Sequence, residues 1–94
     1  MKYTAKPTKK FKKDLKTVQK RGYSIDLLTD VIIKLASGEQ LEAKYNDHEL
    51  QGEYKGCREC HIAPDWLLVY KIGENTSYLY LARTGTHSDL FRNN

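Results

Sequence analysis

Three histidines, His48, His61 and His87, are the side chains of this sequence best suited to acid–base chemistry. All three lie in the second half of the chain, each in a short polar or turn-rich motif. Imidazole has the unperturbed pKa nearest neutrality, so it can both accept and donate a proton. Each histidine alone is better explained as a surface or structural residue. Their combination with a carboxylate, Asp65, and an arginine, Arg83, indicates metal-free acid–base chemistry of the kind a ribonuclease needs.

RNA can be cut without a metal when its own 2′-hydroxyl attacks the adjacent phosphate. Such a reaction needs a base for that hydroxyl, an acid for the departing 5′-oxygen, and a cation near the phosphate. The histidines offer the acid and the base, while Asp65 can orient an imidazole and Arg83 can hold the phosphate. Trp66 or Phe91 can stack on a base.

Each of these assignments has a structural alternative. Trp66 begins the most apolar stretch of the chain and is as readily a core residue, and Phe91 can simply close the edge of a sheet. Asp65 follows Pro64, a common arrangement in turns, and Arg83 can be an ordinary surface residue.

The run from Cys57 to His61 matches C-x-x-C-H, a pattern typical of covalent haem attachment and, in part, of redox dithiols and zinc sites. We reject all three interpretations. The only methionine is Met1, no export signal precedes the motif, and no second cysteine pair completes a zinc site. If the run is a strand, Cys57 and Cys60 point to opposite faces and cannot share a ligand.

Positive charge is concentrated at the start of the chain. Residues 1–21 hold nine basic residues and one acidic residue, although the net charge of the whole chain is only +4. The stripe formed by Lys9, Lys10, Lys12 and Lys13 suits a phosphate backbone or an acidic partner, and a plain solvated helix face is the alternative.

Length and composition predict one cytosolic domain over residues 1–94. The mean hydropathy of −0.70 and the absence of a long apolar run argue against a transmembrane helix, and we expect no membrane association. Two cysteines are too few for a secreted disulfide framework.

Periodicity predicts the order β-α-α-β-β-β. Residues 2–6 read as a strand, and Thr8 can cap a first helix that has Phe11, Leu15 and Val18 on its apolar face and ends at Gly22. A second helix, capped by Ser24, runs to Gly38; its apolar residues are Ile25, Leu27, Leu28, Val31, Ile32, Ile33 and Leu35.

The remaining segments predict a loop and three strands. Residues 39–52, including His48, lack a period and read as a loop, and 54–62, 66–72 and 77–84 read as strands joined by tight turns. Thr86 can cap a last helical turn. We therefore expect an α+β fold in which two helices cover one face of a small twisted antiparallel sheet, leaving the other face for function.

Three motifs in order resemble the YafQ branch of the RelE/ParE toxin superfamily. They are D-H-x-L-x-G at 47–52, H-x-x-P-D-W at 61–66, and R-x-G-x-H-x-x-L-F at 83–91, and the lysine-rich first helix matches as well. The resemblance spans essentially the whole chain and implies a RelE-like toxin domain.

The resemblance also implies a function and residue roles. Members cleave mRNA in the ribosomal A site without metal or cofactor, which would make His48 and His61 bases or substrate-orienting groups, with the choice of base left open. Asp65 would polarise them and His87 would be the acid. Trp66 and Phe91 would position the nucleotide, and Arg83 would stabilise the phosphate.

The partners implied by the resemblance are an antitoxin, the ribosome and its mRNA. A cognate antitoxin of DinJ or RelB type would hold the toxin inactive, expected as a heterotetramer that meets operator DNA only through the antitoxin. The four lysines of the basic stripe would contact ribosomal RNA.

Two rival functions remain. A ParE-like, non-catalytic toxin that poisons DNA gyrase shares the fold, but we do not expect the three histidines and Asp65 in such a chain. A plain RNA-binding module would use the basic helix and leave the histidine motifs unexplained.

Overall fold

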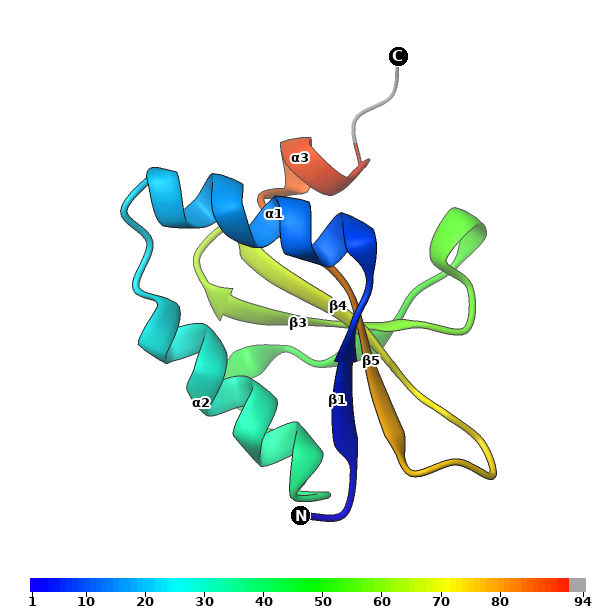
Figure 1. The fold of residues 1–94 in the computed structure, drawn as a ribbon. Helices are drawn as coiled ribbons and strands as arrows, with labels where there is room; N and C mark the ends of the chain where they lie inside the picture. The colour runs from blue at the N-terminus through cyan, green and yellow to red at the C-terminus, as the bar shows by residue number, and fades with distance from the viewer. Residues whose placement is uncertain (92–94) are drawn as a thin grey trace.

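A five-stranded mixed sheet with two long helices forms the protein in this computed structural model, which describes residues 1–91 (Figure 1). The strand order is β1-β5-β4-β3-β2. The elements in chain order are β1 (Thr4–Pro7), α1 (Lys9–Lys20), α2 (Ile25–Ala36), η1 (Ala43–Tyr45), β2 (His48–Glu49), η2 (Gly52–Tyr54), β3 (Arg58–Ala63), β4 (Trp66–Ile72), β5 (Tyr78–Gly85) and α3 (His87–Phe91).

The α+β class and the main order of elements are confirmed, with one change in the sheet. Strands β3, β4 and β5 pair antiparallel, as their tight connections require, but β1 pairs parallel to β5. The sheet is therefore mixed. Parallel pairing of β1 and β5 needs a long connection, and the segment between them, which includes α1 and α2, provides it.

The helices follow their predicted signals closely. Thr8 caps α1 by accepting a hydrogen bond from the backbone N–H of Phe11. Ser24 occupies the equivalent position before α2, but its side chain makes no capping hydrogen bond. The predicted apolar face of α2 was too broad, since Leu27 and Ile33 are 46% and 44% exposed.

Two boundaries in the middle of the chain differ from prediction. The strand predicted over 54–62 begins only at Arg58, because Gly56 adopts a left-handed φ of +95° and the N–H of Cys57 bonds back to the carbonyl of Tyr54. The loop predicted over 39–52 contains a short strand, β2, which places His48 on the sheet edge next to Glu59.

Both faces of the sheet carry apolar side chains, but of unequal extent. The larger cluster joins α1, α2 and one face of the sheet, and includes Phe11, Val18, Leu28, Leu68 and Tyr70. The opposite face carries a small cluster of Leu67, Val69 and Leu90, so α3 covers only its centre. Other side chains on that face, such as His48 and His61, are partly exposed.

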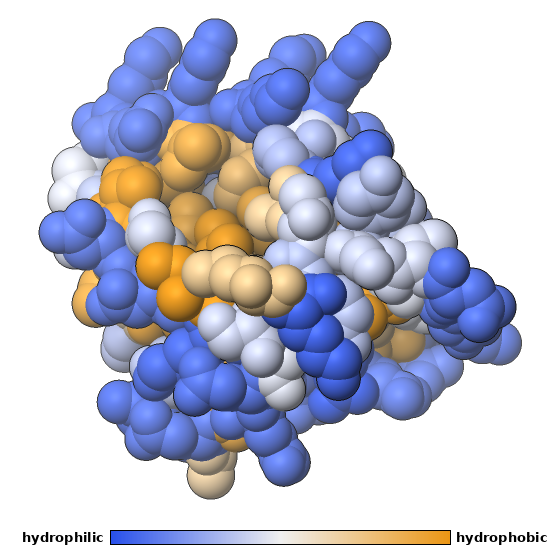
Figure 2. Space-filling model, turned by 60° about the horizontal axis from the view of Figure 1, so that its bottom comes forward, coloured by the Kyte–Doolittle hydropathy of each residue, from blue (hydrophilic) through white to orange (hydrophobic). Residues whose placement is uncertain are grey.

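Hydrophobic side chains also reach the surface. Figure 2 shows a cluster of them on the face seen from below in Figure 1, framed by hydrophilic groups. No helix within residues 1–91 is both long and apolar enough to cross a membrane.

The two cysteines lie on opposite sides of the sheet and are unpaired. Cys60 is fully buried in the larger cluster, whereas Cys57 packs against the smaller one. Burial raises the pKa of the Cys60 thiol to about 12, so this thiol is not a thiolate at neutral pH. The predicted divergence of the two side chains is confirmed.

Candidate functional site

The candidate site lies on the face of the sheet opposite the larger cluster. In the register of the sheet, His48 pairs with Glu59, Glu59 with Val69, and Val69 with Arg83. Directly paired residues share a face, so these side chains from β2, β3, β4 and β5 form one row across the sheet. His61 follows two residues after Glu59 and lies on the same face.

A buried carboxylate, Glu59, lies between two histidines. Glu59 is only 4% exposed, and its Oε1 lies 3.4 Å from Nε2 of His61 and 3.8 Å from Nε2 of His48. The other ring nitrogen of His48, Nδ1, is 2.7 Å from the carbonyl oxygen of Asn46 and donates to it. Both imidazoles are therefore oriented by an acceptor within the protein.

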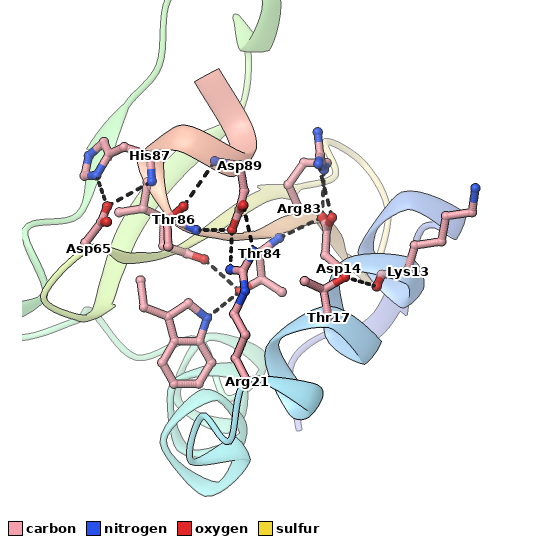
Figure 3. Close-up of polar contacts among 12 residues, drawn as sticks. Lys13, Asp14, Thr17, Arg21, Asp65, Arg83, Thr84, Thr86, His87 and Asp89 are labelled. Carbon is pink, nitrogen blue, oxygen red and sulfur yellow. Dashed lines mark hydrogen bonds and ion pairs between the residues drawn. The ribbon is translucent and has the colours of Figure 1, made fainter. Parts of the chain in front are cut away.

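Asp65 contacts the third histidine, His87, rather than His48 and His61 as the resemblance implied; Glu59 occupies that place beside His48 and His61. Oδ1 of Asp65 accepts from the backbone N–H of His87 at 2.9 Å and from its Nδ1 at 2.7 Å (Figure 3). These bonds, the backbone bond first, lower the pKa of the Asp65 carboxyl below its usual value. Within residues 1–91, the second ring nitrogen, Nε2, forms no hydrogen bond.

The three imidazoles form a continuous row. Ring centroids of His48 and His61 are 6.5 Å apart, and those of His61 and His87 are 5.8 Å apart. Phe91 extends the row, 6.3 Å from His87. This brings together predicted residues from β2, β3 and α3, as the acid–base hypothesis requires.

Helix α3 is anchored so that His87 keeps its position. Asp89 accepts from the N–H of Thr86 and pairs with Arg21, at 2.7 and 3.0 Å, at the end of α1 (Figure 3). The Arg21 guanidinium holds the pKa of Asp89 well below its usual range. A Cβ at Gly85 would lie 2.8 Å from the Asp89 carboxylate, so this approach needs a glycine.

Arg83 is engaged by the protein itself. Its Nε and Nη2 donate to the two carboxylate oxygens of Asp14 at 2.7 and 3.1 Å, and Nη1 donates to the Tyr54 hydroxyl at 3.0 Å. Asp14 also accepts from the N–H of Thr84 at 3.1 Å. The bidentate side of the guanidinium is thus occupied, and a phosphate can meet only its remaining N–H groups.

The two predicted stacking residues differ in exposure. Trp66 is 4% exposed, donates to Thr84 Oγ1 at 2.9 Å, and packs edge-on against Tyr23, with ring centroids 5.0 Å apart. This burial favours its alternative role as a core residue, because neither face of the ring is free. Phe91 is 37% exposed and contacts Tyr54 edge-on, so it can still receive a base.

The basic stripe is exposed as predicted, since the four lysines at 9, 10, 12 and 13 are all exposed on α1.

One group of side chains in the described chain has the spacing of a metal site. Donor atoms of Glu59, His61 and His87 all lie within 4.8 Å of one another. Neither cysteine of the C-x-x-C-H motif belongs to this group.

Two residues of the site were missed from the sequence. Glu59 was detectable, because residues i and i+2 of a strand share a face and His61 was already a candidate. Asp14 is the only acidic residue among nine basic ones in 1–21, and this isolation was a usable signal. Its partner, however, is 69 residues away and could not be read from the sequence.

Comparison with known proteins identifies the family. The family described as "Bacterial toxin of type II toxin-antitoxin system, YafQ" matches residues 3–92. This chain belongs to the YafQ toxin family. The resemblance inferred from the three motifs is therefore confirmed.

Individual YafQ-family relatives agree over nearly the full chain. The mRNA interferase toxin YafQ of Escherichia coli K12 is 42% identical over 82 residues, covering 86% of this chain and 87% of that protein. The crystal structure of a metal-bound toxin from Helicobacter pylori superposes with a TM-score of 0.88 and 47% identity, covering 95% and 99% of the two chains. The toxin in an E. coli DinJ–YafQ complex gives 0.85 and 38%, covering 95% and 98%.

We predict that Asp14→Ala lowers the free energy of unfolding by about 2 to 4 kcal/mol, because it leaves the half-buried Arg83 and the N–H of Thr84 without their acceptor. Urea unfolding followed by circular dichroism measures this change. Asp30→Ala, which removes an exposed carboxylate from α2, is the matched control and should stay within about 0.5 kcal/mol of the unmodified protein. Equal effects of the two substitutions would contradict the anchoring role of Asp14.

Proposed function

We propose that this YafQ-family protein is an mRNA endoribonuclease, the toxin of a bacterial toxin–antitoxin pair, which cleaves mRNA in the ribosomal A site. The observation that carries the proposal is the row of three imidazoles, each beside a carboxylate, on the face of the sheet opposite the larger cluster. The E. coli relative bears the name mRNA interferase, which agrees with this chemistry. A non-catalytic toxin that poisons DNA gyrase does not need acid–base groups, so the row of imidazoles favours the nuclease.

In the proposed reaction the 2′-oxygen forms a bond to the adjacent phosphorus while the bond to the 5′-oxygen breaks. A base, His61 or His48, takes the proton of the 2′-hydroxyl, and His87 gives a proton to the departing 5′-oxygen. The products are a 2′,3′-cyclic phosphate and a 5′-hydroxyl. No metal or cofactor is needed, because the imidazoles carry both protons.

The neighbouring carboxylates orient these groups. Asp65 holds Nδ1 of His87 and so directs Nε2 toward the substrate. Glu59 lies beside Nε2 of His61, so in that ring Nδ1 is the nitrogen that faces away from the carboxylate. Arg83 contributes the remaining N–H groups to the phosphate, and Phe91 receives a base. In this proposal Trp66 does not contact the RNA. Its buried ring joins β4 to β5 by donating a hydrogen bond to Thr84.

The proposed partners follow the family. A solved relative is bound to DinJ, and we propose an antitoxin of DinJ or RelB type for this chain, in a heterotetramer that contacts operator DNA through the antitoxin. The toxin acts where ribosomes are, in the cytoplasm.

We predict that His87→Ala slows cleavage of mRNA on programmed ribosomes by about 10² to 10⁴-fold, because it removes the acid. The His87 side chain is 54% exposed, so the fold should survive. Ser88→Ala, on the same helix, is the control and should cleave normally. Full activity of a folded His87→Ala protein would refute the assignment.

We predict that replacing the four lysines of the basic stripe, Lys9, Lys10, Lys12 and Lys13, by glutamine weakens ribosome binding and lowers the slope of log affinity against log salt by about 3. The matched control replaces four exposed lysines outside α1, at 2, 6, 55 and 71. An unchanged slope for the α1 variant would show that the basic stripe is an ordinary solvated helix face that does not contact RNA.

We predict that Zn²⁺ or Cu²⁺ inhibits the enzyme rather than activating it. Glu59, His61 and His87 can coordinate such an ion together, and a bound ion occupies the nitrogen lone pairs that proton transfer requires. A relative has been crystallised as a metal-bound toxin. Titration of cleavage with metal, and with a chelator, tests this; loss of activity on chelation would contradict the metal-free mechanism.

A further inference from the structure

Asp47 precedes His48 and takes no part in the chemistry proposed above, yet it is held by two side chains of the sheet. Its Oδ1 accepts from Nε of Arg58 at 2.8 Å, and its Oδ2 accepts from the hydroxyl of Tyr70. These partners lie directly opposite each other, on β3 and β4. A single carboxylate therefore joins the edge segment to two inner strands.

Tyr45 and Leu50 pack against the two clusters on either side of the segment that carries His48, but the segment itself has few backbone bonds. Strand β2 is two residues long and pairs only with β3, as an edge strand. It is preceded by Asn46 in a left-handed conformation, φ +47°, and followed by one backbone bond, from Leu50 N–H to the carbonyl of Cys57. So short a strand is not stable by its own backbone pairing.

The two sides of this segment have different partners. Asp47 contacts Tyr70 of β4, whereas His48 lies beside Glu59, which pairs with Val69; neighbouring residues of a strand face opposite ways, so Asp47 and His48 point to opposite sides of the sheet edge. Tyr70 belongs to the larger cluster, behind the site, and is 2% exposed. Burial, followed by the adjacent Asp47 carboxylate, raises the pKa of Tyr70 above its usual range, so the hydroxyl keeps the proton that it donates.

We infer that Asp47 is a positioning residue, which binds Arg58 and Tyr70 behind the sheet and thereby holds the His48 imidazole beside Glu59 and His61 in front of it. The inference rests on the proposed function, because it assumes that His48 takes part in cleavage. Without Asp47 the edge segment keeps its sequence and its histidine but loses the contact that sets their position. Misplacement of a reacting group by about 1 Å costs on the order of 10²-fold in rate.

The test compares cleavage of mRNA on programmed ribosomes by four proteins: the unmodified chain, Asp47→Ala, His48→Ala and the double variant. We expect Asp47→Ala to lower kcat by about 10 to 100-fold with little change in KM. We expect the double variant to be no slower than His48→Ala alone, because Asp47 acts only through His48. Amide hydrogen exchange at residues 48–49 should be faster in Asp47→Ala.

Two further variants guard against a general loss of folding. Tyr70→Phe removes one hydroxyl from the core and keeps the ring, and should lower kcat by about three- to tenfold. Glu49→Ala is the matched control. Glu49 follows His48 on β2, and one of its carboxylate oxygens lies 3.6 Å from Nη1 of Arg58, but its side chain is 75% exposed. It should change kcat by less than about twofold.

The outcomes separate this inference from the function it rests on. An inactive His48→Ala with normal kcat in both Asp47→Ala and Tyr70→Phe would overturn the role of Asp47 alone. A double variant clearly slower than His48→Ala would overturn it too, because Asp47 would then act on another group. Normal cleavage by His48→Ala would remove His48 from the mechanism, and the inference with it.

Discussion

The pairing of carboxylates with imidazole and guanidinium groups sets the geometry on which the candidate site depends. Glu59 lies between His48 and His61, Asp65 holds His87, and Asp14 holds Arg83. Asp89, on α3, pairs with Arg21, and Asp47, just before β2, pairs with Arg58. Hydrogen bonds to charged groups are stronger and more directional than neutral ones, so they can hold side chains of edge and loop segments that have little packing.

This pairing has an electrostatic consequence. The carboxylates lie beside the histidines and Arg83 of the candidate site, while the four exposed lysines of the basic stripe lie on α1 and form no ion pair with any residue of 1–91. If the stripe binds RNA as proposed, that attraction comes from α1 and not from the acid–base groups. Asp14 connects the two regions, since it belongs to α1 and anchors Arg83 of β5. A ribosome that binds the basic helix can present mRNA to the row of imidazoles.

The sequence was sufficient for most of the fold and for the histidines of the site, but not for Glu59, Asp14 or the contacts among the site residues. The limits of β4, the caps of α1 and α3, and the opposite directions of Cys57 and Cys60 all follow from local periodicity and turn chemistry. Strand β2 was missed because two residues carry no period. Its pairing depends on β3, which starts at Arg58 rather than 54 because of a glycine turn.

The site residues differ in the same way. Motif spacing predicted the histidines and Asp65, whereas the occupied guanidinium of Arg83 and the buried ring of Trp66 depend on partners far away in the chain. Asp14 and Tyr54 reach Arg83 only after the sheet and α1 have packed. Local sequence does not contain that information, and tertiary contacts supply it.

In the proposed mechanism this domain supplies acid–base groups and the ribosome supplies the alignment of the RNA. The single-turnover rate of cleavage of one mRNA by the purified toxin tests this, measured on ribosomes that hold the cleaved codon in the A site and on the same RNA free in solution. We expect cleavage to be at least about 10³-fold faster on the ribosome, because alignment is a large part of catalysis. Equal rates on free and ribosome-bound RNA would contradict it.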